Sequence, residues 1–126
     1  MDAYDPLKAP DPTVWLELDE AERTALIEVY HEPQDIKIPG MTLHVTIHAI
    51  VENQAAEGDT LPVREKLRQL MAQGLDRHEA IHAIGSVLIK HIAAIAQGKA
   101  AGATDPNTAY FRALHRLNAR KWLRSG

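Results

Sequence analysis

Two histidine pairs, each with a spacing of four residues, set the strongest limit on how this chain can fold. His44 and His48 form the first pair, and His78 and His82 form the second. In an α-helix this spacing places both rings on one face, one turn apart, whereas in a strand it would separate them by about 13 Å. Both pairs therefore predict helices on which neighbouring imidazoles can bind one metal ion.

Apolar residues recur every three or four positions through most of the chain, which predicts an all-α protein. Asp19 and Asp76 are each followed by Glu three residues later, as in a capping box, and they mark the starts of two helices. Gly74 is expected to end the helix between them. β-branched residues between positions 42 and 47 leave a strand as the competing interpretation there, but the period of the pattern favours a helix. The expected helices cover about residues 19–31, 41–56, 62–74, 77–98 and 106–124, after a short helical turn that begins at Asp11 and Pro12.

The chain of 126 residues has the length of a single domain. We expect a helical bundle with four main helices and a C-terminal one. Proline and acidic residues make residues 1–11 a flexible N-terminal lead, residues 12–98 form the bundle domain, and residues 99–126 form a hinge and a basic C-terminal helix.

The two histidine pairs are expected to meet in such a bundle. Helices separated by one intervening helix run parallel in an up-and-down bundle, and each pair lies near the start of its helix. Glu52 follows His48 by one turn and adds a carboxylate to the same stripe. Because the chain has no cysteine, any metal must use nitrogen and oxygen ligands, and zinc or iron is the expected divalent ion.

His78-Glu79-x-x-His82 is also the short motif of many zinc proteases, in which Glu79 would be the general base. Here Glu79 falls three residues after Asp76, so an ordinary capping box explains it equally well. A protease needs a third ligand, but His91 faces another side of the helix and His115 lies beyond the hinge. Protease activity is therefore not favoured.

Three functions stay open at this point. The leading one is a divalent-metal-binding protein, and the first alternative is a small metal-dependent enzyme, hydrolytic or oxygen-dependent, in which Glu79 or Glu52 moves a proton. The second is a non-catalytic interaction module with structural histidines and a basic helix that binds a partner. The basic residues recur every four positions on that last helix: Arg112, Arg116, Arg120 and Arg124.

The charge and hydropathy of the chain limit the kinds of partner that it can bind. The net charge of −3 argues against nucleic acid, and no apolar run is expected to reach the roughly 20 residues that cross a membrane. The first residues are acidic and do not form a secretory signal pattern, so a cytoplasmic protein of a bacterial type is expected. The partner would be a small molecule or a protein, and a homo-oligomer is left open.

Three motifs occur in order along the chain: Trp15-x-x-Leu18-Asp19-Glu20-x-Glu22-Arg23, His44-x-x-x-His48-x-x-x-Glu52-Asn53-Gln54 and Leu75-Asp76-Arg77-His78-Glu79-Ala80-x-His82-Ala83-Ile84-Gly85-Ser86. Over about residues 12–95 the chain resembles a bacterial domain-of-unknown-function family of small helical proteins. The resemblance implies a helical domain and assigns no catalytic residue. The tail from Gly98 onward departs from the family pattern.

Overall fold

The computed structural model describes residues 1–31, 41–98 and 107–125, and helices make up nearly all of its regular structure. No strand occurs in these three ranges, which confirms the all-α prediction. Residues 32–40 and residues 99–106, where the hinge is expected, lie outside the described residues. The helices are α1 (Pro12–Glu17), α2 (Glu20–His31), α3 (Met41–Ala56), the 3-10 helix η1 (Gly58–Thr60), α4 (Val63–Ala72), α5 (Arg77–Ala96), α6 (Thr108–Arg116) and α7 (Ala119–Ser125).

Aspartates set the starts of three helices, as local sequence predicts. Asp11 accepts a hydrogen bond from the backbone N–H of Val14 at 3.1 Å, and Pro12 occupies the first helical position. Asp19 and Glu22 form a full capping box, in which each side chain accepts the backbone N–H of the other residue. Asp76 accepts the N–H of Glu79 at 2.8 Å.

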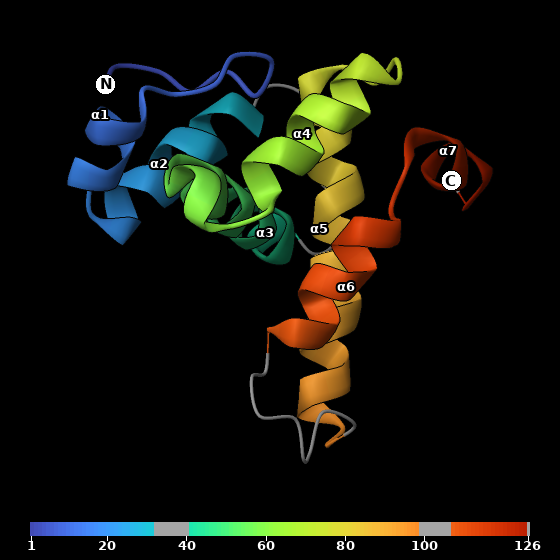
Figure 1. Cartoon of the computed structure of the whole chain (residues 1–126). Coiled ribbons are helices and arrows are strands. Elements are labelled where there is room, and N and C mark those ends of the chain that lie inside the picture. Colours follow the sequence, from blue (N-terminus) through green and yellow to red (C-terminus); the bar gives the residue numbers. More distant parts are fainter. Residues whose placement is uncertain (32–40, 99–106, 126) are drawn as a thin grey trace. The chain divides into compact units, whose positions relative to one another are not determined.

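The chain divides into two compact units, Met1–Arg64 and Glu65–Gly126. In the first unit, α1 and α2 both pack against α3 (Figure 1). Trp15 of α1 is fully buried, and its indole N–H donates to the side-chain oxygen of Asn53 on α3 at 2.9 Å. Arg23 of α2 donates to the same oxygen at 3.1 Å and to the backbone oxygen of Trp15 at 3.0 Å. One amide oxygen therefore joins all three helices of this unit.

The N-terminal segment, expected as a flexible lead, contributes to the core of the first unit. Tyr4 is only 4% exposed and belongs to a buried cluster with Trp15, Ile27, Val45 and Ala49. Its ring packs on Trp15 with centroids 5.8 Å apart. An aromatic ring that buries this much apolar surface holds its backbone in place, even in a segment rich in proline and acidic residues.

A tight turn after α3 requires glycine. Gly58 has φ of +76°, in the left-handed region that side chains with a Cβ rarely adopt. A Cβ at this position would also lie 3.3 Å from the guanidinium of Arg64. That guanidinium donates to the backbone oxygen of Ala55 at 3.0 Å and so satisfies a carbonyl at the end of α3.

In the second unit, α6 lies alongside α5 (Figure 1). Tyr110 and Leu114 of α6 are buried, and Tyr110 stacks on His91 of α5 at a centroid distance of 5.5 Å. Burial raises the pKa of the Tyr110 hydroxyl. Gly74 ends the turn after α4 with φ of +108°, as predicted. Residues 107–125, which the sequence suggested as a separate tail, thus pack within the same unit as α5.

The expected C-terminal helix is two helices, which corrects the prediction of one helix over residues 106–124. Leu117 leaves helical geometry with φ −68° and ψ 136°, and α7 begins two residues later. The buried ammonium of Lys66 donates to the backbone oxygen of Leu117 at 2.9 Å, and burial lowers its pKa. The side chain of Gln73 accepts the N–H of Ala119 at 2.8 Å. These bonds from α4 satisfy the backbone at the break, and the break divides the arginine stripe between two helices.

The apolar length of α5 corrects an expectation from the sequence. By length and composition it could cross a membrane, contrary to the expectation that no apolar run would reach this length. One such helix is weak evidence for a membrane, because the core helix of a soluble protein passes the same test. Its first part is buried at Ile81, Ile84 and Leu88, but Ile92 and Ile95 are 44% and 45% exposed. The apolar residues of α5 are therefore covered over only part of the helix.

Candidate metal centre

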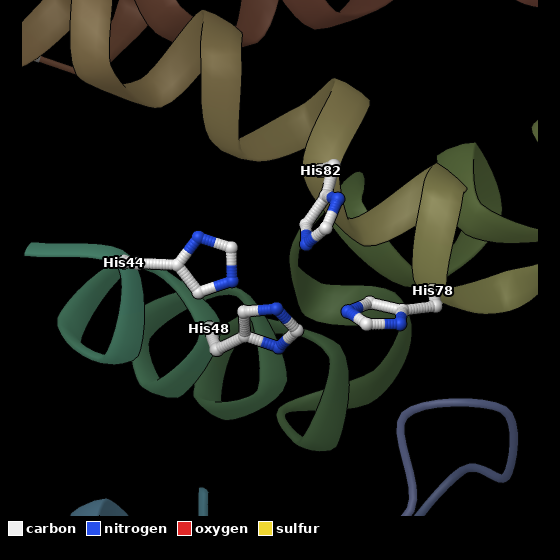
Figure 2. Close-up of side chains that lie close together, drawn as sticks. All are labelled: His44, His48, His78 and His82. Carbon is white, nitrogen blue, oxygen red and sulfur yellow. The ribbon is translucent and has the colours of Figure 1, made fainter. Parts of the chain in front are cut away.

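The first histidine pair lies on α3, within the first unit. The ring centroids of His44 and His48 are 4.9 Å apart, and both rings project from the same side of the helix (Figure 2). His48 is 1% exposed, while His44 is half-buried. A helical spacing of four places the two rings side by side directly, as the sequence predicted.

The second pair lies in the first two turns of α5. The ring centroids of His78 and His82 are 4.4 Å apart, and both side chains are half-buried. Asp76 defines the start of α5, because its carboxylate accepts the N–H of Glu79.

The four histidines together form a group that could hold a metal ion. One ligand nitrogen of each lies within 4.8 Å of the ligand nitrogens of the other three. Four imidazole nitrogens are a donor set that zinc or iron accepts.

Glu52, which the sequence offered as a fifth ligand, does not belong to this group of four. It is 1% exposed, and its Oε2 accepts a hydrogen bond from the hydroxyl of Tyr4 at 2.5 Å. The same hydroxyl lies 3.2 Å from Nδ1 of His48. The carboxylate is thus linked to a histidine of the group through Tyr4.

Glu79 has a structural partner in this protein. Its Oε1 accepts a hydrogen bond from the indole N–H of Trp122 at 2.6 Å, and its backbone N–H is capped by Asp76. The carboxylate therefore holds α7 against α5. The half of the capping box made by Asp76 is present, while the Glu79 carboxylate bonds to Trp122, an anchoring role that the motif alone does not reveal.

His91 and His115 have other surroundings. His91 stacks on Tyr110, and its Nε2 is buried with no hydrogen-bond partner among the described residues. His115 is exposed in the last turn of α6. Neither belongs to the group of four, as their helical positions predicted.

Sequence reasoning missed Tyr4 and Trp122, the partners of the two carboxylates. Each lies more than 40 residues from its partner, and no local spacing connects them. A partial signal did exist elsewhere: Trp15, Arg23 and Asn53 occur within the motifs of the resemblance, and the structure shows them hydrogen-bonded to one another. Some motif residues therefore serve packing rather than the metal centre.

No family model, curated protein or solved structure matches this chain. The resemblance to a bacterial family of small helical proteins stays a prediction. The functional proposal below therefore depends on the geometry and chemistry of the residues themselves.

Proposed function

We propose that this protein binds one divalent transition-metal ion, zinc or iron, through His44, His48, His78 and His82. The observation that carries the proposal is the convergence of four ligand nitrogens within 4.8 Å of one another. Two chelating pairs, each preorganised by its own helix, lower the entropy that metal binding would otherwise cost.

The donor set favours a transition metal over calcium or magnesium. Imidazole nitrogen suits zinc, iron, nickel and copper, whereas calcium and magnesium require oxygen ligands. Cysteine is absent from the sequence, so the set has no thiolate to add net charge. The buried carboxylate of Glu52, linked to His48 through Tyr4, supplies negative charge near the cation.

Elemental analysis of the purified full chain tests the proposal. Protein produced with added zinc or iron should carry about one equivalent of metal, since four nitrogens fill one tetrahedral set. His48→Ala and His82→Ala, one change in each pair, should each abolish stoichiometric metal. His115→Ala is the matched control, because His115 is exposed and outside the group, and it should leave the metal content unchanged. Wild-type protein without stoichiometric metal after supplementation would overturn the proposal.

We further propose a closed, structural coordination sphere rather than a catalytic one. Four imidazoles satisfy zinc completely, and a catalytic site keeps one position open for water. The side chain of Glu79, the candidate general base, is engaged by Trp122. X-ray absorption of the metal-loaded protein should show four nitrogen ligands and no bound water. A water ligand would instead favour the small metal-dependent enzyme.

A further inference from the structure

Three polar side chains form a buried chain of hydrogen bonds inside the first unit. Tyr4, His48 and Glu52 are 4%, 1% and 1% exposed. The hydroxyl of Tyr4 lies between the other two, at 2.5 Å from Oε2 of Glu52 and 3.2 Å from Nδ1 of His48. Buried polar groups of this kind are costly unless their bonds are satisfied, so their arrangement is strongly constrained.

The positions of the protons determine which atom donates and which atom accepts in these bonds. The Tyr4 hydroxyl has one proton, and it donates this proton to Oε2 of Glu52. For the contact between Tyr4 and His48 to be a hydrogen bond too, Nδ1 of His48 must carry a proton and donate it to the phenol oxygen. In a neutral imidazole this tautomer has its lone pair on Nε2, the nitrogen through which a metal can be bound.

We propose that Tyr4 is a positioning residue for the metal centre and that it acts through His48. This inference rests on the proposed function, and it adds that the N-terminal segment is part of the site. Glu52 orients Tyr4, Tyr4 selects the tautomer and ring orientation of His48, and His48 then presents Nε2 to the ion. Partners that hold the second nitrogen of a ligand histidine typically change metal affinity by about 10–100-fold.

This role also explains why a carboxylate lies one turn beyond His48 without joining the group of four. Glu52 shares the helical stripe of His44 and His48, which is why its spacing suggested a ligand. Its Oε2 is instead committed to Tyr4. One face of α3 therefore carries two metal ligands, His44 and His48, together with the carboxylate of Glu52, which orients His48 through Tyr4.

Tyr4→Phe tests the inference, because it removes the hydroxyl and keeps the ring that packs in the core. Competition with a chelator should show zinc affinity reduced about 10–100-fold relative to wild type. Tyr30→Phe is the matched control: Tyr30 packs edge-on against Tyr4 at a centroid distance of 6.1 Å, and its change should alter affinity less than about twofold. Glu52→Gln keeps an acceptor for Tyr4 but removes the charge, so it should give an intermediate loss and provides a second variant if Tyr4→Phe does not fold.

A spectroscopic measurement separates this inference from the proposed function. Long-range ¹H–¹⁵N spectra of the metal-free protein should show the proton of His48 on Nδ1 in wild type and a loss of that preference in Tyr4→Phe. A proton on Nε2 in wild type would overturn the inference, even if metal binds. Unchanged zinc affinity in Tyr4→Phe would also overturn it and leave the four-histidine site standing, whereas failure of the wild type to bind metal would remove both.

Discussion

Helices α3 and α5 carry the same His-x-x-x-His spacing, yet the two pairs are supported in different ways. On α3, His48 is buried and hydrogen-bonded through Tyr4 to Glu52. On α5, both histidines are half-buried, and the support comes from the Asp76 cap and from the bond between Glu79 and Trp122. On α3 the hydrogen-bonded side chains contact a histidine ring directly, whereas the bonds of Asp76 and Glu79 act on the helix that carries the second pair.

This difference teaches that helical spacing determines the distance between two rings but not their surroundings. The centroid distances of 4.9 Å and 4.4 Å are similar, since both follow from the helix. Burial and hydrogen bonding of each ring depend on what packs against the helix. The three comparisons below test this contrast, mainly through the stability of the metal-free protein, which does not include metal binding.

The largest effect is expected from comparing His48→Ala with His82→Ala. His48→Ala should lower the free energy of unfolding by about 2–3 kcal/mol, because it opens a cavity and leaves the Tyr4 hydroxyl with one buried partner fewer. His82→Ala should lower it by less than about 1 kcal/mol, since that side chain is half-buried. Chemical denaturation in the presence of a chelator measures both values, and equal losses would show that the two pairs are supported alike.

A smaller effect is expected when the support of α5 is removed through Trp122→Phe. The indole N–H donates to the carboxylate of Glu79 at 2.6 Å, and hydrogen bonds to charged groups contribute about 1.5–3 kcal/mol. The loss should appear as lower thermal stability and as faster trypsin cleavage after Lys121 in α7.

Glu79→Gln is the control for this bond, because it keeps an acceptor for Trp122 and should lose less stability than Trp122→Phe. If trypsin cleaves the Trp122→Phe variant no faster than wild type, the bond does not anchor α7.

The smallest of the three effects is expected from Asp76→Ala. It removes the side chain that accepts the N–H of Glu79 at 2.8 Å, and loss of such a cap costs about 1 kcal/mol. Because His78 lies in the same helical turn, fraying should also weaken zinc binding, by less than tenfold. Asp76→Asn retains a capping oxygen and should recover most of the stability. Zinc affinity that falls as far as in Tyr4→Phe would mean that the two supports are equivalent.

The start of each predicted helix was readable because it depends on residues within one turn. Asp19 with Glu22 and Asp76 with Glu79 satisfy the first N–H groups of α2 and α5, and these partners are three residues apart. Met41–Ala56 was predicted as a helix with its observed limits, despite its β-branched residues. The period of the apolar residues outweighed their weak strand preference.

Errors arose where a distant partner decides the conformation. A continuous helical pattern runs through Leu117, but Lys66 and Gln73 bond the backbone on either side of a break there. The helical period places Leu67, Leu70 and Met71 on one face of α4, yet Met71 is 43% exposed, whereas Leu67 and Leu70 are buried. Packing partners, not periodicity, choose among neighbouring positions on a helix.

By itself the sequence determined most of the helices, the aspartate caps and the two histidine pairs, because all of these follow from interactions that span three or four residues. Tertiary structure decided what the carboxylates do. Glu52 bonds to Tyr4, 48 residues away, and Glu79 bonds to Trp122, 43 residues away. Such partners are selected by the burial of aromatic side chains in a folded core, and no local spacing encodes them.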